Sequence, residues 1–225
     1  MLYHLLFPLH TDWGVLNVIQ YITFRTAAAS LTAFVLSLAF GPLVIKWLRV
    51  LQIKQVVRDD GPATHAVKAG TPTMGGLLLL GAALIPTLLW TDLTNQYVWI
   101  AVVSTASFGA IGFVDDYLKV TRETSRGLSV RGKLLAQGVV ALVVGLALIE
   151  LARNNLYNTD IIFPFFKEFT PDIGWLYVPF AMLILLMASN AVNLTDGLDG
   201  LAISVFTVAA GAFTALAYVS GHAVI

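Results

Sequence analysis

Six stretches of this 225-residue chain are apolar over roughly the 20 residues that a helix needs to cross a bilayer. They cover residues 26–45, 74–91, 97–114, 134–151, 175–189 and 201–219. None of them shows the regular alternation of polar and apolar positions that is typical of a membrane β-strand. The sequence therefore predicts an all-α, polytopic transmembrane bundle with six spans, within one integral membrane domain over residues 1–225.

The composition excludes several other classes of protein. Hydrophobic residues make up 58% of the chain and charged residues only 12%, which leaves too little polar surface for a soluble domain. The formal net charge is zero, so bulk charge gives no reason to expect nucleic-acid binding. There are no cysteines, which excludes disulfides, thiol catalysis, iron–sulfur clusters and cysteine-bound zinc.

The basic residues predict the orientation of the spans. Ten of the thirteen lysines and arginines lie in or beside two connections, between spans one and two and between spans three and four: Lys46, Arg49, Lys54, Arg58, Lys68, Lys119, Arg122, Arg126, Arg131 and Lys133. Positive charge accumulates on the cytoplasmic side of membrane proteins. We therefore expect both connections to be cytoplasmic, the N-terminus to lie outside, and the connection between spans five and six to be cytoplasmic as well.

Three polar clusters fall on this expected cytoplasmic side. The first covers residues 57–76 and is rich in glycine and proline, with Lys68, Thr73 and His65 among its polar members. Glycines let a backbone approach a ligand closely, and a cation with a hydroxyl suits a phosphate. The order of residues is not that of a P-loop. A solvated basic loop with ordinary turns is the alternative interpretation.

The second cluster is a pair of carboxylates, Asp115 and Asp116, which follow directly after the third apolar stretch. Neighbouring residues on a helix point about 100° apart, so we expect the two side chains to have different roles, such as binding a metal, a proton or a second ligand. Carboxylates are unfavourable at a helix C-terminus and costly near a bilayer. The alternative is that they only solvate the end of the helix.

The third cluster is a series of amides and carboxylates between the last two spans. Asn190, Asn193, Asp196 and Asp199 recur at every third position, with Gly197 and Gly200 beside them. Oxygen ligands of this kind suit Mg²⁺ or Mn²⁺. A polar turn with Asx caps is the alternative.

Taken together, the clusters indicate a metal-dependent transferase that moves a phosphorylated group from a soluble donor to a lipid phosphate or alcohol. A secondary transporter would place its ionisable residues near the midplane and would show repeated halves, neither of which the sequence contains. An intramembrane prenyltransferase would carry a second aspartate-rich helix of matching pattern, which is also lacking.

Three segments resemble the phospho-N-acetylmuramoyl-pentapeptide transferases, a family in the polyprenyl-phosphate N-acetylhexosamine-1-phosphate transferase superfamily. They are DDGP with TPTMGG (within residues 59–76), GFVDDY (112–117) and NAVNLTDGLDG (190–200). The segments occur in the family's order, and the similarity extends from about residue 23 to the end of the chain. The TPTMGG segment favours this family over related polyprenyl-phosphate sugar-1-phosphate transferases, which remain the alternative.

The resemblance implies an activity. Phospho-MurNAc-pentapeptide would pass from its UDP carrier to undecaprenyl phosphate, with Mg²⁺ as cofactor, to give lipid I and UMP for peptidoglycan synthesis, which supports cell shape and division. It also implies a multi-pass protein of the bacterial inner membrane with a cytoplasmic active face, a homodimer, and inhibition by nucleoside antibiotics. Whether the phosphate attacks directly or through a covalent enzyme intermediate is left open.

The resemblance also implies the site residues. The catalytic residues would be Asp115, Asp116, His65 and Asp196. The substrate would be bound by Lys68, Thr73, Asn190, Asn193, Gly197, Leu198 and Asp199, and the metal by Asp115, Asp116 and Asn193.

One departure from the family is large. Its members continue for several further spans, which carry another Mg²⁺-ligating aspartate and a histidine-rich loop. We therefore expect the chain to be C-terminally incomplete and to be inactive alone, with the activity belonging to the full-length enzyme. The alternative is an inactive fragment that acts as a binding target.

Overall fold

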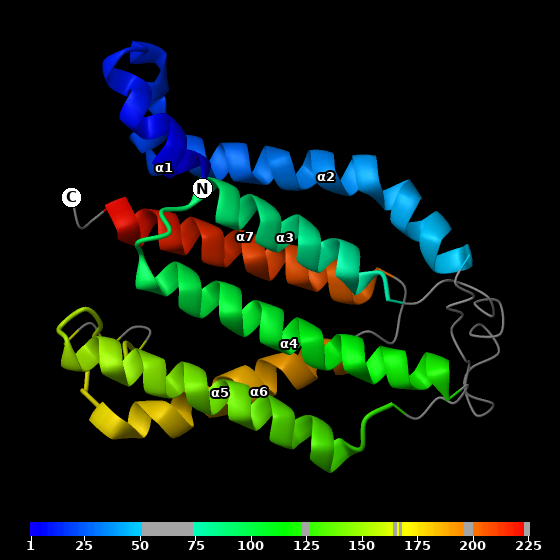
Figure 1. Cartoon of the computed structure of the whole chain (residues 1–225). Helices are drawn as coiled ribbons and strands as arrows, with labels where there is room; N and C mark the ends of the chain where they lie inside the picture. The colour runs from blue at the N-terminus through cyan, green and yellow to red at the C-terminus, as the bar shows by residue number, and fades with distance from the viewer. Residues whose placement is uncertain (51–73, 123–126, 164–165, 167, 196–199, 223–225) are drawn as a thin grey trace. The chain divides into compact units, whose positions relative to one another are not determined.

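The computed structural model describes residues 1–50, 74–122, 127–163, 166, 168–195 and 200–222. Within these ranges all the regular elements are helical (Figure 1). In chain order they are α1 (Leu2–Leu6), two 3₁₀ helices (Phe7–Thr11 and Gly14–Gln20), α2 (Ile22–Val50), α3 (Gly76–Trp90), α4 (Gln96–Thr121), α5 (Val130–Arg153), a 3₁₀ turn (Gly174–Leu176), α6 (Tyr177–Thr195) and α7 (Leu201–His222).

The predicted all-α architecture is confirmed, and each of the six apolar stretches forms a helix. Five of these helices are long and apolar enough to cross a membrane, whereas α3 has 15 residues and is shorter. It begins two residues later than expected, because Met74 has a φ of 70° that a right-handed helix does not accommodate. In contrast, α6 continues beyond residue 189 to Thr195, so it carries the first part of the third polar cluster.

The helices expose their apolar side chains to an extent that only a lipid environment makes favourable. In the most hydrophobic 18-residue window of α7, none of the residues is buried within the protein. In the corresponding windows of α2 and α4, 6% is buried. In water, each Å² of exposed apolar surface would cost about 25 cal/mol. The chain is therefore a multi-pass membrane protein whose helices use lipid as their solvent.

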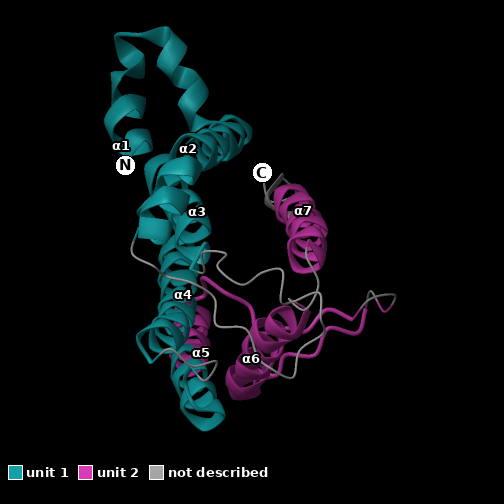
Figure 2. Cartoon of the chain, turned by 90° about the vertical axis from the view of Figure 1, so that its right-hand side faces the viewer, with its two compact units in different colours: residues 1–140 teal, residues 141–225 magenta. Residues whose placement is uncertain are grey.

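The chain forms two compact units, residues 1–140 and residues 141–225 (Figure 2). In the first unit α2, α3 and α4 run antiparallel and side by side (Figure 1). The indole Nε1 of Trp90 donates a hydrogen bond to Thr32 Oγ1 at 3.0 Å, which joins α3 to α2. Gly109 of α4 lies so close to Leu80 of α3 that an added Cβ would be 2.7 Å from the leucine side chain.

This antiparallel arrangement gathers several charged helix ends. Val50 ends α2, Gly76 begins α3, Thr121 ends α4 and Val130 begins α5, and in Figure 1 these four termini lie at one end of the first unit. The described basic residues of the two predicted cytoplasmic connections belong to this end: Lys46, Arg49, Lys119, Arg122, Arg131 and Lys133. The fold thus places these basic residues at the same end of the first unit, as the predicted orientation requires. That this end faces the cytoplasm stays a prediction.

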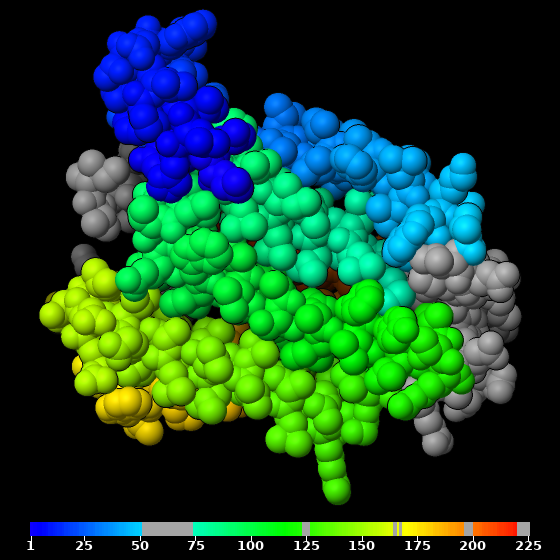
Figure 3. Space-filling model, viewed as in Figure 1, coloured from blue at the N-terminus to red at the C-terminus, as the bar shows by residue number. Residues whose placement is uncertain are grey.

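The first residues fold over the opposite end of the first unit (Figures 1 and 3). The amino group of Met1 donates to the carbonyl oxygen of Leu88 at 2.7 Å, and the Nε2 of His4 accepts from the N–H of Leu93 at 3.0 Å. The first contact satisfies a carbonyl near the C-terminus of α3, and the second satisfies a backbone N–H just after the helix. The first residues are therefore helical, and these contacts hold them against the end of α3 and the residues that follow it.

The second unit contains the latter part of α5 together with α6 and α7. An added Cβ at Gly145 of α5 would lie 3.1 Å from Val178 Cγ1, so the glycine permits close packing of α6. In the connection before α6, Asp160 and Asp172 form a β-bridge. The pKa of Asp172 lies below its ordinary value because the Thr159 hydroxyl and the Gly174 N–H both donate hydrogen bonds to its carboxylate.

Candidate functional site

The structure describes four of the predicted site residues. Asp115 and Asp116 lie near the C-terminal end of α4, and Asn190 and Asn193 lie in the last turns of α6. The other predicted site residues fall outside the described residues: His65, Lys68, Thr73, Asp196, Gly197, Leu198 and Asp199. Because α4 belongs to the first unit and the end of α6 to the second, the aspartate pair and the asparagine pair are described separately.

Asp115 is a buried carboxylate with partners on both of its oxygens. Only 8% of the residue is exposed. Oδ1 accepts a hydrogen bond from the backbone N–H of Leu128 at 2.7 Å. Oδ2 lies 2.9 Å from Nζ of Lys119 and 3.7 Å from Nζ of Lys133. The side chain therefore connects α4 to the segment before α5 and to the first turn of α5.

Asp116 occupies a different environment. Its side chain is 37% exposed, compared with 12% for that of Asp115, and its Oδ1 lies 2.9 Å from the same Lys119 ammonium. The two neighbours thus point to different surroundings, as the helical geometry predicts. Their separate roles in catalysis stay predictions.

The lysines explain how a buried carboxylate is tolerated at this position. Burying a charge without a partner is strongly unfavourable, whereas a paired charge with hydrogen bonds to its remaining oxygen is acceptable. Lys119 lies four residues after Asp115 and three after Asp116, the spacings at which helical side chains meet. The cluster of Asp115, Asp116, Lys119 and Lys133, here called the carboxylate–lysine cluster, holds two negative and two positive charges.

Gly127 completes the enclosure of Asp115. A Cβ added at Gly127 would overlap with Oδ1 of Asp115 and would lie 2.7 Å from its backbone oxygen. Only a glycine lets the backbone come close enough for the N–H of Leu128 to reach the carboxylate. The position of Asp115 is therefore fixed from both α4 and the connection to α5.

The sequence analysis did not assign a role to Lys119, Lys133, Gly127 or Leu128. The signal for Lys119 was present, because a lysine three and four residues after two aspartates pairs with them on a helix. Lys133 and the Leu128 amide carry no such signal. Their proximity to Asp115 depends on the path of the chain between α4 and α5, which spacing alone does not determine.

Replacing Gly127 by alanine should displace Asp115. We expect Gly127→Ala to lower the free energy of unfolding by about 1–3 kcal/mol, because the added methyl group overlaps with the carboxylate and breaks its hydrogen bond. We also expect about a tenfold to hundredfold loss of turnover, since a catalytic group displaced by about 1 Å loses much of its effect. Thermal unfolding and initial rates of the full-length protein measure both changes.

The control is Gly112→Ala on α4, the helix that carries Asp115. A Cβ at Gly112 would meet nothing within 4 Å, so alanine should leave turnover unchanged and should raise helix stability by about 0.5–1 kcal/mol. Equal behaviour of the two variants would show that the close approach at Gly127 does not position Asp115.

The asparagines on α6 are less enclosed. Asn190 is half-buried, and its Nδ2 donates to the carbonyl oxygen of Leu186 at 2.8 Å, whereas Asn193 is exposed. Beyond the end of α6, Gly200 has a φ of 80°, a conformation that favours glycine. The structure thus accounts for one glycine of the third cluster as a turn residue at the start of α7.

The described residues do not test the metal prediction. Among the described residues, no group of three or more histidine, cysteine, aspartate or glutamate side chains is arranged to hold an ion. Asp115 and Asp116 supply carboxylate oxygens, the donor type that Mg²⁺ prefers. Of the two, Asp116 has the more exposed side chain and one lysine partner, so its donor chemistry fits a metal ion better than that of the enclosed Asp115.

Comparison with known proteins yields two family matches. The model described as "Glycosyl transferase family 4" matches residues 98–225, which include the aspartate pair and the asparagine series. The model described as "Phospho-N-acetylmuramoyl-pentapeptide-transferase signature 1" matches residues 68–80.

Curated relatives agree with these matches. The protein from Desulfatibacillum aliphaticivorans is 53% identical over 225 residues, and those from Maridesulfovibrio salexigens and Koribacter versatilis are each 49% identical over 222 and 238 residues. Each is named phospho-N-acetylmuramoyl-pentapeptide-transferase. The alignments cover 99% of this chain but 61%, 61% and 62% of the three relatives, so the chain spans less than two thirds of their length.

Proposed function

Because this chain belongs to glycosyl transferase family 4 and carries a signature of the phospho-N-acetylmuramoyl-pentapeptide-transferases, we propose that the full-length protein transfers phospho-MurNAc-pentapeptide from its UDP carrier to undecaprenyl phosphate. The products are lipid I and UMP. In this reaction an oxygen of the lipid phosphate forms a bond to the sugar-linked phosphorus, and the bond from that phosphorus to UMP breaks.

The observation that carries the proposal is the carboxylate–lysine cluster at the end of a membrane-spanning helix. The phosphate of a lipid lies at the membrane surface. The cluster offers that phosphate two kinds of group, the lysine cations and the aspartate carboxylates. Phosphoryl transfer depends mainly on positioning and on stabilisation of charge. The cluster supplies fixed charges of both signs where the lipid head group would be.

Within this proposal the two aspartates divide the work. Asp115 is buried and both of its oxygens face N–H donors, so it can fix the positions of Lys119 and Lys133. Asp116 is more exposed and has one lysine partner, so it is the carboxylate that can hold Mg²⁺. When bound, the metal would neutralise charge that develops on the transferred phosphate.

The nucleotide side of the site is proposed from the family motifs. Asn190 and Asn193 would contact the UDP donor from the end of α6, together with His65, Lys68, Thr73 and the residues 196–199. Amide and backbone groups suit the hydrogen bonds of a uridine, and a lysine suits a diphosphate. The family membership supports this assignment, and the gathered basic helix ends support a cytoplasmic active face in the inner membrane.

Two further properties are proposed on the family resemblance alone. These are assembly as a homodimer and inhibition by nucleoside antibiotics, which would compete with the uridine of the donor. Neither enters the argument for the reaction.

A donor comparison tests the substrate class. Full-length protein in lipid bilayers should consume UDP-MurNAc-pentapeptide at least about a hundredfold faster than UDP-N-acetylglucosamine, because a site that binds the peptide leaves its polar groups unpaired with the smaller donor. Preference for UDP-N-acetylglucosamine would assign the protein to a related sugar-1-phosphate transferase. Binding of the donor without turnover would indicate an inactive binding protein.

A further inference from the structure

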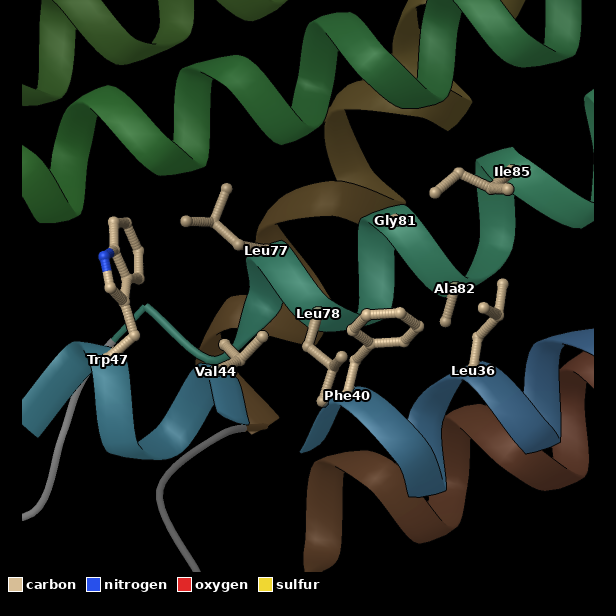
Figure 4. A pocket seen from close by; sticks show the side chains of 9 residues that line it. All are labelled: Leu36, Phe40, Val44, Trp47, Leu77, Leu78, Gly81, Ala82 and Ile85. Carbon is tan, nitrogen blue, oxygen red and sulfur yellow. The ribbon is translucent and has the colours of Figure 1, made fainter. Parts of the chain in front are cut away.

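The first unit carries charged side chains at both of its ends and apolar side chains between them. The pocket between α2 and α3 belongs to the apolar part, and Figure 4 shows its lining: Leu36, Phe40, Val44, Trp47, Leu77, Leu78, Gly81, Ala82 and Ile85. The carboxylate–lysine cluster lies at one end of the unit. At the other end His4 meets Asp92, and Tyr3 meets Arg25. This second group of charges has no part in the proposed reaction.

One nitrogen of His4 faces two partners that need opposite protonation states. Its Nε2 accepts a hydrogen bond from the backbone N–H of Leu93 at 3.0 Å and lies 3.2 Å from Oδ1 of Asp92. A ring nitrogen without a hydrogen accepts one hydrogen bond, whereas the same nitrogen in a protonated ring donates one. Nε2 can therefore pair with Leu93 or with Asp92, but not with both at once.

Asp92 stays ionised over the pH range in which histidines ordinarily change their charge, between about pH 5 and 8. Its Oδ1 accepts hydrogen bonds from the Thr94 hydroxyl at 2.7 Å and from the Thr94 N–H at 2.9 Å, and these two bonds hold the pKa of Asp92 below its ordinary value. The side chains of His4 and Asp92 are 37% and 36% exposed, so the ring can exchange protons with water. A protonated His4 therefore faces a carboxylate.

Two positive groups lie nearby. The guanidinium of Arg25, on α2, lies 4.5 Å from the centre of the Tyr3 ring, whose edge-to-face contact with the His4 ring has a centroid distance of 5.1 Å. The amino group of Met1 belongs to the same segment as His4. Both cations interact electrostatically with the Asp92 carboxylate. Protonation of His4 is thus favoured by one carboxylate and opposed by two cations.

We propose that His4 fastens the first residues to the connection between α3 and α4 (residues 91–95) in both of its protonation states. A neutral ring binds through the Leu93 N–H, and a protonated ring binds through the Asp92 carboxylate. This exchange of partners keeps the segment attached when the pH falls. Under the predicted orientation this end of the unit lies outside, where the pH is that of the surroundings.

Nuclear magnetic resonance of the imidazole nitrogens tests the exchange. Full-length protein labelled with ¹⁵N in histidine and leucine is placed in lipid nanodiscs, and the signals of His4 are those that His4→Gln removes. At pH 7.5 we expect the hydrogen to be on Nδ1, because Nε2 accepts from Leu93. At pH 5 both nitrogens should carry a hydrogen.

Hydrogen exchange of the Leu93 amide reports the partner that is released. Its protection factor, corrected for the intrinsic exchange rate at each pH, should fall about fivefold between pH 7.5 and pH 5, which corresponds to the loss of one hydrogen bond. The Leu93 signal is the one that Leu93→Ile removes. In His4→Gln the amide oxygen can accept at every pH, so the protection of Leu93 should not change.

The variant Asp92→Asn tests the acid partner. It keeps an oxygen for Thr94 but removes the negative charge, so protonated His4 loses its ion pair. The amide of Leu5, which donates to the Met1 carbonyl within the first residues, should lose protection about twofold to fivefold at pH 5 but not at pH 7.5. In the wild-type protein the protection of Leu5 should be equal at both pH values.

The control is His10→Gln. His10 is the other histidine of the first residues, and its ring stacks on Phe7, so this variant should behave as the wild-type protein does. A pH dependence of Leu93 that disappears in His10→Gln would assign the effect to the wrong histidine and would overturn the proposal.

The proposal is also wrong if Nδ1 of His4 carries no hydrogen at pH 7.5, or if the protection of Leu93 in the wild-type protein is the same at both pH values. An equal loss of protection at Leu5 in the wild-type protein and in Asp92→Asn would show that Asp92 is not the acid partner. If Asp92→Asn does not fold, the imidazole nitrogens and the Leu93 amide of the wild-type protein still decide between these outcomes.

Discussion

Replacing Asp115 by asparagine in the full-length protein should lower turnover on the order of 10³-fold while changing the KM for the UDP donor less than about threefold. The amide keeps the shape of the side chain and can still accept the Leu128 N–H, but it removes the charge that orients Lys119 and Lys133. Initial rates at varied donor concentration, together with calorimetric titration of the donor, measure the two effects separately.

The control for this variant is Lys133→Met. It removes one of the two ion pairs of Asp115 but keeps the carboxylate, so turnover should fall by no more than about tenfold if the carboxylate itself carries the chemistry. Normal turnover by Asp115→Asn would end its assignment as a catalytic residue. Equal losses in the two variants would mean that Asp115 acts only by holding the helices together.

Removing Mg²⁺ should abolish product formation, with a rate loss of at least about 10³-fold in excess chelator. The reason is that the donor diphosphate, the lipid phosphate and two aspartates bring several negative charges together, and only two lysines face the described carboxylates. Rates are measured in chelator, in chelator saturated with Mg²⁺, and after Mg²⁺ is restored. Sustained turnover in excess chelator would show that the cations of the protein suffice.

The sequence was sufficient for the architecture because the bilayer imposes it. A stretch of apolar residues in lipid must satisfy its backbone hydrogen bonds internally, so residues 97–114 could only become a helix. The residues at which the helices begin and end were harder to predict. The helix α4 extends to Thr121 because Lys119 neutralises the two aspartates that would otherwise disfavour its last turns.

The candidate site was predicted in its residue types but not in its arrangement. Asp115 and Asp116 were recognisable from their cost beside an apolar stretch, and their different environments followed from helical geometry. The roles of Lys133 and Gly127 depend on the contacts that residues 127–133 make with Asp115. Contacts of this kind join segments of the chain through a path that neither hydropathy nor spacing encodes.

The most direct test of the proposed reaction is the identity of the released nucleotide. Full-length protein, undecaprenyl phosphate, Mg²⁺ and UDP-MurNAc-pentapeptide labelled in both the uridine and the sugar are incubated together, and the products are separated. Transfer of a phosphosugar predicts UMP and a lipid-linked sugar in equal amounts. Release of UDP, or of UMP without a labelled lipid, would contradict the account, because the bond broken or the acceptor used would then be a different one.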